Sequence, residues 1–228
     1  MPQRLPLFPL GSVLFPGLVL PLHVFEPRYR LLVQDLVAEA TAEDEETVKG
    51  FGVVAIRAGH EVGEGNVQAL HEIGCVALLR EVSESDDGQY EIVTVGAGRF
   101  RVVGIDEAAG TPYLTALVEP FGDDDSEDAD DDGELRLLAA DVTRRFEEYR
   151  EVLDIGGAAA PEDPRVVSYL VAAAMVLTVG QRQLLLEAPD TRSRLLAERD
   201  LLRRETALVT TFGAVPATEL PVLPADPN

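Results

Sequence analysis

The chain has 228 residues, 46% of them hydrophobic, which is enough for a sizeable folded core. Its 41 acidic and 19 basic residues give a formal net charge of −22. This charge disfavours binding to nucleic acid or to anionic membranes, because proteins bind both largely through lysine and arginine. Neither an apolar run long enough to span a membrane nor a signal-peptide pattern is found, and the single cysteine, Cys75, cannot form an intramolecular disulfide. We therefore expect a cytoplasmic protein.

The opening segment, residues 5–36, combines five prolines with dense apolar residues. Proline fixes φ and removes a backbone donor, which argues against one long helix or a central strand. We expect short extended pieces that turn at 15–17, a strand over 18–25, and a helix from Pro27 to about Ala38. A segment this apolar needs to be buried by later parts of the chain.

Further strands are predicted where β-branched runs lie between turn signals, over residues 51–56, 73–82, 89–95, 99–105 and 113–118. Asp87-Gly88 favours a hairpin, and Gly96-Ala97-Gly98 favours a tight turn before Arg99. About six strands at short spacing, with one inserted helix, predict closed or nearly closed β structure.

The composition changes at residues 122–132, where eight of eleven residues are acidic, and we interpret this run as a linker. Beyond it, apolar residues recur at helical spacing. We expect a helix that ends near Gly156, one capped by Asp163 that runs to about Thr178 and is apolar on nearly every face, a short one over 181–187, and a last one over 190–210. The expected organisation is a β-rich subdomain (1–121), the linker (122–132), a helical subdomain (133–212) and a flexible proline-rich tail (213–228).

Four stretches carry a family pattern. They are LPLFPL…FPG…PLHVFEPRYRLL near the start, Ile73-Gly-Cys-Val-Ala77, Val95-Gly-Ala-Gly-Arg-Phe-Arg-Val102, and Gln181-Arg-Gln-Leu-Leu-Leu-Glu187 with Asp190 and Arg194-Leu195. In this order and spacing they resemble the Lon substrate-binding domain, the N-terminal region of Lon proteases. Cys75 stands where that family usually has a threonine. The resemblance implies an α+β fold: a PUA-like β pseudobarrel of about six strands with one inserted helix, followed by a C-terminal α-helical bundle.

Full-length Lon proteases add an ATPase module and a Ser–Lys protease module, and the sequence contains neither pattern. Lys49 is the sole lysine, and it lacks the glycines and the hydroxyl of a phosphate-binding loop. The nearby acids at 43–46 raise a lysine's pKa, which opposes its use as a neutral base. We therefore expect a free-standing, non-enzymatic domain.

Other site chemistry is poorly supported. The three histidines, His23, His60 and His71, and Cys75 are spread over strands and make a poor metal set, so we expect no metal or other cofactor and a core role for Cys75. The Gly96-x-Gly98 pair leads into a strand, unlike a dinucleotide loop, and no G-x-S-x-G motif is present, although an undetected hydrolase stays open as a minor alternative.

The candidate peptide-binding residues surround the predicted first strand and its helix: Phe15, Leu18, His23, Phe25, Arg28 and Tyr29. Their apolar, proline-kinked surface predicts a groove, where the β half meets the helical half, for exposed apolar segments of other proteins, with added hydrogen bonds from a strand edge. The alternative is structural, with Glu26 capping the helix and Arg28 or Arg30 pairing with acids.

The function predicted from these features is a protein- or peptide-binding module. It would recognise unfolded or degron-bearing segments, or act as an adaptor to a separate protease or chaperone. The acidic run is interpreted as a solubilising spacer, with attraction of basic clients as the alternative. A small-ligand or RNA-binding PUA-like module is the rival hypothesis, and the net charge argues against RNA.

Overall fold

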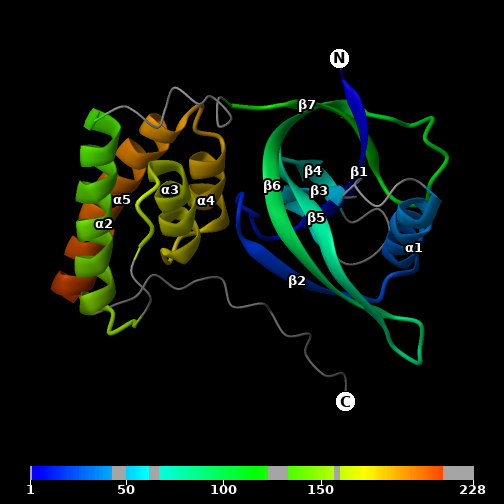
Figure 1. Cartoon of the computed structure of the whole chain (residues 1–228), viewed down its shortest axis with the longest axis horizontal. Coiled ribbons are helices and arrows are strands. Elements are labelled where there is room, and N and C mark those ends of the chain that lie inside the picture. Colours follow the sequence, from blue (N-terminus) through cyan, green and yellow to red (C-terminus); the bar gives the residue numbers. More distant parts are fainter. Residues whose placement is uncertain (1, 43–49, 62–66, 123–132, 157–159, 213–228) are drawn as a thin grey trace. The chain divides into compact units, whose positions relative to one another are not determined.

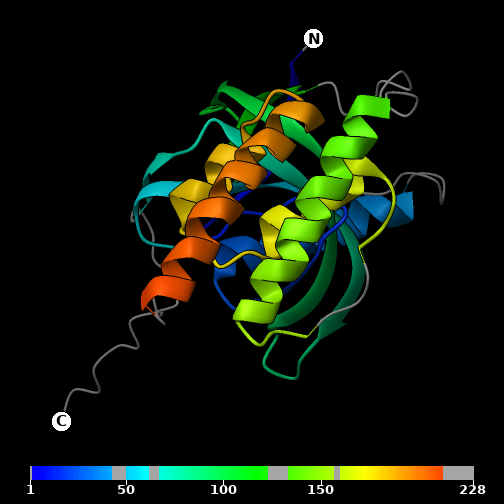
Figure 2. The same ribbon diagram turned by 90° about the vertical axis from the view of Figure 1, so that its left-hand side faces the viewer.

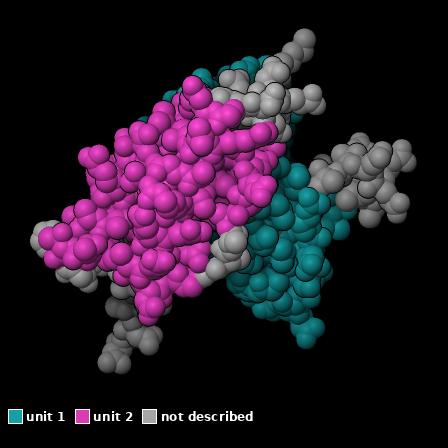
Figure 3. Space-filling model, turned by 60° about the vertical axis from the view of Figure 1, so that its left-hand side comes forward, with its two compact units in different colours: residues 1–126, 186–190 teal, residues 127–185, 191–228 magenta. Residues whose placement is uncertain are grey.

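The computed structural model describes residues 2–42, 50–61, 67–122, 133–156 and 160–212. Seven strands and five helices lie in these ranges, which makes the fold α+β (Figure 1). Two compact units are present: a sheet unit of residues 1–126 and 186–190, and a helical unit of residues 127–185 and 191–228 (Figure 3). Residues 123–132 and 213–228, where we predicted a linker and a tail, lie outside the described residues.

The sheet unit contains all seven strands: β1 (Gln3–Leu10), β2 (Val19–Val24), β3 (Gly50–Gly59), β4 (Val67–Leu70), β5 (Ile73–Glu84), β6 (Tyr90–Ile105) and β7 (Thr115–Pro120). The strand order is β1-β7-β6-β5-β3-β4, and β2 pairs with β6. All pairs are antiparallel except β1 with β3, which is parallel. Because β1 is also the first strand of this order, its pairing with β3 connects the far part of the sheet back to the first strand. The predicted strands and the hairpin at Asp87-Gly88 are confirmed, with shifted ends, whereas β1 and β4 were not predicted as strands.

β1 is a regular strand although it contains Pro6 and Pro9. Its first half, residues 3–6, pairs with β7, and its second half, residues 7–10, pairs with β3. Within the described residues, each half therefore pairs with a single strand, and a proline without an N–H group is tolerated where a strand has no partner on one side. This arrangement explains why a proline-rich sequence forms a strand here.

The predicted tight turn before Arg99 is wrong, because β6 continues through it as one strand with a bulge. Cys75 pairs with Arg99 and Ala77 pairs with Gly96, so β6 carries one extra residue. A Cβ on Gly96 would lie 2.1 Å from the carbonyl oxygen of Phe15. The glycine thus allows residues 15–18 to approach β6, where the Gly96 N–H donates to Leu18 O at 2.8 Å.

The core of the sheet unit has two parts, because β1 and β3 bury residues on both faces. The larger cluster gathers the buried side of α1 (Pro27–Ala42) with alternate residues of the strands, among them Phe8, Phe51 and Ile92. The smaller cluster lies around Leu7, Val54 and Phe100. Cys75 is fully buried in the larger cluster, which confirms its predicted core role.

The helical unit contains α2 (Gly133–Val152), α3 (Pro164–Ala174), most of α4 (Val179–Leu186) and α5 (Thr191–Phe212). α2 packs against α3 and α5, and α2 and α5 lie side by side (Figure 2). The predicted cap of α3 is confirmed, since the Asp163 carboxylate accepts from the N–H groups of Arg165 and Val166. α3 ends before the predicted residue 178 because Met175 is extended, and it is not buried all round, because Val166 is 44% exposed.

None of the helices in the described ranges combines the length and the apolar character needed to cross a membrane.

Candidate functional site

Two of the predicted site residues, Phe15 and Tyr29, lie inside the protein rather than on its surface, with 1% and 3% of each side chain exposed. The Tyr29 ring stacks on Phe8 at 4.1 Å between centroids, and burial raises the pKa of its hydroxyl to about 12. Leu18 is half-buried and packs against the larger core cluster. These three side chains therefore pack into the interior of the sheet unit. The prediction that Phe15 and Tyr29 lie at the surface was wrong.

The other residues near β2 form an exposed row, which we call the β2 face: Val19, Pro21, His23 and Phe25. Side chains two residues apart in an extended chain point to the same side, and all four are exposed, Val19 by 63% and Phe25 by 46%. The imidazole of His23 and the ring of Phe25 stack with centroids 6.0 Å apart. Val19 and Pro21 were not predicted, although the alternation of residues 19, 21, 23 and 25 was a usable signal.

His23 is paired with the neighbouring strand. Its Nδ1 lies 2.5 Å from Oε1 of Glu91 on β6, and the hydrogen bond to this carboxylate raises the pKa of the imidazole. Both side chains are more than half exposed. His23, hydrogen-bonded to Glu91, therefore adds an accessible polar group to the otherwise apolar β2 face.

Arg28 plays the structural part that the alternative hypothesis gave it. Its Nη2 lies 2.9 Å from Oε2 of Glu26, and its guanidinium lies over the Tyr29 ring at 4.5 Å. The carbonyl of Glu26 accepts the first helical N–H groups, from Tyr29 and Arg30. Arg28 thus belongs to the start of α1 and borders the β2 face.

Arg99 joins two of the sequence motifs, a role that the sequence did not reveal. The side chain is 3% exposed, and its guanidinium donates to three carbonyls, those of Leu186, at 2.7 Å, Ala188 and Pro189. The segment 186–190 belongs to the sheet unit, although it follows α4 in the chain. Through Arg99, the motif at 95–102 therefore binds the segment 186–190, which begins at the end of the motif at 181–187.

The motif in the helical unit is also structural. Thr178 and Gln181 form a reciprocal cap at the start of α4, with the Gln181 side chain accepting from the Thr178 N–H and the Thr178 hydroxyl accepting from the Gln181 N–H. Arg194 is fully buried, donates to Leu185 O and Ser168 Oγ, and lies over the ring of Tyr169. These contacts explain the spacing of the motif without a ligand.

Within the described ranges, no group of three histidine, cysteine or acidic side chains is arranged to hold a metal ion. His71 faces Glu187, with 3.6 Å between Nδ1 and Oε1, whereas the buried Sγ of Cys75 lies 3.5 Å from Ala97 O. His71 and Cys75 thus have different partners and do not form a shared site.

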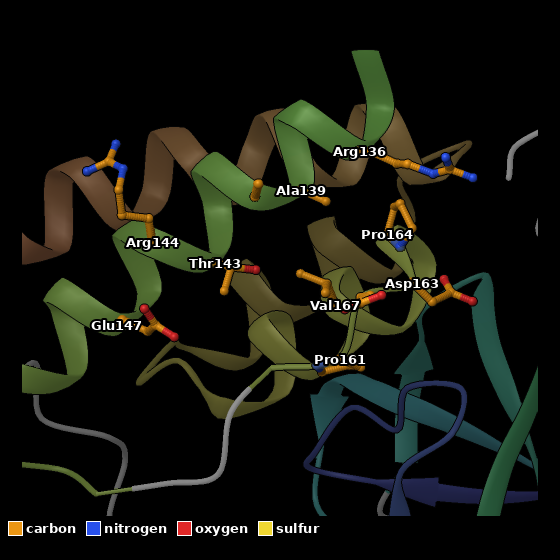
Figure 4. A pocket seen from close by; sticks show the side chains of 11 residues that line it. Arg136, Ala139, Thr143, Arg144, Glu147, Pro161, Asp163, Pro164 and Val167 are labelled. Atoms are coloured by element: carbon orange, nitrogen blue, oxygen red, sulfur yellow. The ribbon is translucent and has the colours of Figure 1, made fainter. Parts of the chain in front are cut away.

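A pocket of about 760 Å³ lies between α2 and the start of α3 in the helical unit. Figure 4 shows α2 along one side, with Pro161, Pro164 and Val167 on the other. Two of its charged groups already have structural partners: Arg144 pairs with Asp141 and Glu148, and Asp163 caps α3. We therefore assign this pocket no ligand.

Comparison with known proteins relates the whole chain to one family. The family model of the ATP-dependent protease La (LON) substrate-binding domain matches residues 4–204. The "Lon protease 2" of Myxococcus xanthus is 31% identical over 216 residues, which cover 92% of this chain and 24% of that protein. The "Lon protease 2" of Syntrophobacter fumaroxidans is 29% identical over 201 residues, which cover 86% of this chain and 24% of that protein. The chain thus spans about a quarter of the length of these relatives.

Two solved structures share the fold. The crystal structure of a Lon N-terminal domain protein from Xanthomonas campestris matches with a TM-score of 0.60 and 28% identity, covering 88% of this chain and 98% of that one. The N-terminal domain of the Mycobacterium avium complex Lon protease matches with a TM-score of 0.59 at 18% identity and the same coverage. Sequence motifs, family model and fold agree, and the chain belongs to the family of the Lon substrate-binding domain.

Proposed function

We propose that this chain is a non-enzymatic polypeptide-binding module that holds exposed apolar segments of other proteins, its clients. The observation that carries the proposal is the β2 face, where Val19, Pro21 and Phe25 are exposed beside one another. Grouped exposed apolar side chains are typical of interaction surfaces. The description of the family as a substrate-binding domain supports the same function.

The proposed site consists of the β2 face with Leu18 and Arg28 at its borders. Burial of a valine such as Val19 against a client contributes about 1.5 kcal/mol, which corresponds to about tenfold in affinity. Phe25 adds an aromatic anchor of the kind that dominates binding energies. The site therefore suits segments with several apolar residues, as unfolded or degron-bearing proteins offer.

The finer architecture and the cellular role are further parts of the proposal. The path of strand pairings that returns to β1 supports a PUA-like pseudobarrel, and the contacts of α2 with α3 and α5 support a helical bundle. We propose subdomains at 1–121 and 133–212, with the segment 186–190 added to the first, joined by the acidic linker 122–132 and followed by the proline-rich tail 213–228. In the cell, the module would act as an adaptor that presents clients to a separate ATP-dependent protease or chaperone.

The test is a titration with a disulfide-reduced, denatured model protein and with apolar peptides, followed by fluorescence anisotropy. Binding in the micromolar range is expected, and Val19→Ser should weaken it about tenfold. Val103→Ser is the matched control, because Val103 on β6 is also a half-exposed valine of the sheet unit. No binding at high micromolar protein, or equal effects of the two variants, would contradict the proposal.

The rival function, RNA binding, has less support. Glu81 and Glu91 lie on the same side of the sheet as the β2 face, because they align with Pro21 and His23 across the pairings of β2, β6 and β5. Carboxylates repel phosphate. A gel shift with structured and single-stranded RNA at moderate salt should show no complex.

A further inference from the structure

We propose that a client segment binds as an added antiparallel strand along the free edge of β2, with its apolar side chains in register with the β2 face. This inference rests on the proposed function, since it specifies how the β2 face takes its client. Strand addition uses backbone hydrogen bonds for affinity and the alternate side chains for selectivity. The β2 edge and the β2 face offer both.

The free edge follows from the pairing of β2. Among the residues that the structure describes, β2 pairs only with β6, in the register Val19 with Val95 through Val24 with Tyr90. The carbonyl of Leu18 accepts from Gly96 N–H, and the carbonyl of Leu20 accepts from the Thr94 hydroxyl. Even-numbered residues therefore direct their backbone groups to β6.

The odd-numbered residues direct theirs the other way, because backbone groups alternate sides along a strand. Val19 and His23 each present an N–H and a carbonyl at the free edge, and Pro21 presents a carbonyl alone. The edge thus offers three acceptors and two donors. The missing donor at Pro21 also weakens pairing of the edge with arbitrary strands, which protects an exposed edge from aggregation.

An added antiparallel strand pairs with this edge, and its apolar side chains join the β2 face when the apolar client residues lie opposite the odd-numbered residues of β2. Three client residues, opposite His23, Pro21 and Val19, donate their N–H groups to the three carbonyls. The client carbonyls opposite His23 and Val19 accept from the two N–H groups, and the one opposite Pro21 stays unpaired. The client residues between these positions have their N–H groups on the outer side. Antiparallel addition is favoured because it pairs slightly more strongly per residue than parallel addition.

Charge distinguishes the two ends of the edge. The His23 end lies beside acidic groups, with Glu91 at 2.5 Å from His23 and Asp87 close enough to raise the pKa of its imidazole. The Val19 end is apolar, with Val95 opposite it on β6. An antiparallel client enters with its N-terminal flank at the His23 end. The preferred client is therefore an extended apolar segment that is preceded by lysine or arginine.

The register is tested by N-methyl scanning of the fluorescein-labelled peptide Lys-Leu-Thr-Val-Thr-Phe-Ser. Methylation should weaken binding about fivefold at alternate positions, where an N–H donates to β2, and should leave it unchanged at the positions between. A lysine-to-aspartate exchange at the peptide's N-terminus should weaken binding several-fold at low salt, and the same residues moved to the C-terminus should matter less.

Pro21→Ala provides the complementary test on the protein, because it restores an N–H at the free edge. Affinity for the peptide should rise a few-fold, whereas Pro112→Ala, at an exposed proline in the loop before β7, should change nothing.

Peptide binding with uniform sensitivity to N-methylation, or with no gain for Pro21→Ala, overturns strand addition and leaves the proposed function intact. Absence of peptide binding overturns both. Sedimentation as a dimer that Val19→Ser dissociates would make a second copy of the chain the occupant and also overturn the inference.

Discussion

The two units treat buried charge differently. In the sheet unit, the buried guanidinium of Arg99 donates to three backbone carbonyls. In the helical unit, Glu198 on α5 is fully buried, and neither of its carboxylate oxygens has a hydrogen-bond partner among the described residues. The buried charge of Arg99 is thus stabilised by hydrogen bonds, whereas the carboxylate of Glu198 is buried without a hydrogen bond in the described part of the chain.

The difference has consequences for pH. An arginine stays charged at every accessible pH, so the contribution of Arg99 is constant. Burial raises the pKa of Glu198 well above its usual range, and the nearby charge of Arg194 only partly opposes this. The hydrogen bonds of Arg99 in the sheet unit therefore do not change with pH, whereas the stability of the helical unit depends on the protonation of Glu198.

The largest effect is expected from Arg99→Met. It removes the donors of three carbonyls and should destabilise the sheet unit by about 3–5 kcal/mol, because each buried acceptor left without a donor costs about 1–3 kcal/mol. Urea unfolding followed by circular dichroism measures this change. The control is Arg101→Met, because Arg101 is exposed and also lies over the Phe121 ring, at 4.9 Å. Equal losses for both variants would show that the carbonyl contacts do not matter.

A smaller loss is expected from Gly96→Ala. The new Cβ would lie 2.1 Å from Phe15 O, so the turn at 15–18 has to move away from β6, at about 2–3 kcal/mol. Gly98→Ala is the matched control two residues along the same strand, because no atom lies within 4 Å of its Cβ position. Similar urea midpoints for the two variants would refute the close approach.

These contacts mark the limit of what the sequence predicts. The helices of the helical unit follow from local periodicity, whereas β2, α1 and the cap at Asp163 follow from the positions of prolines and of a capping residue. The bulge at Gly96 depends on the Phe15 carbonyl, and the contact of Arg99 depends on a loop near residue 188, so neither has a local signal. β4 was missed because four residues are too short for a pattern.

The candidate site was predicted in part for the same reason. Composition identified the segment around β2, but it cannot tell which of its apolar residues point inward. Phe15 and Tyr29 are as apolar as Val19 and Phe25, yet the first two are buried in the structure and the last two are exposed. Alternation identifies Val19 as outward-facing on β2, whereas Phe15 lies before that strand and Tyr29 lies on α1, where strand alternation does not apply.

Glu198→Gln tests the protonation argument. Because the folded-state pKa is raised, the folded protein binds the proton more tightly, and wild-type stability should fall as pH rises above about 4.3, the usual glutamate value, until the folded-state pKa is passed. The glutamine variant should lack this decline and be more stable than the wild type at pH 8, because it has no carboxylate to ionise in the core. Thermal unfolding between pH 4 and 8 measures the difference. Asp200→Asn, at an exposed acid of the same helix, should leave the decline in place.

The smallest effect concerns a carboxylate of the helical unit that does have partners. Asp163 accepts two N–H groups at the start of α3, at 2.8 and 3.1 Å, so Asp163→Ala should cost about 1 kcal/mol at neutral pH, the usual value of an N-cap. Asp163→Asn keeps an acceptor oxygen and should restore most of the loss. Removal of the hydrogen-bonded Asp163 carboxylate should thus destabilise the helical unit at pH 8. Removal of the Glu198 carboxylate, which has no hydrogen bond among the described residues, should stabilise it at the same pH. The same sign for both substitutions, measured in one urea series at pH 8, would mean that hydrogen-bond partners do not decide how this unit responds to the loss of a carboxylate.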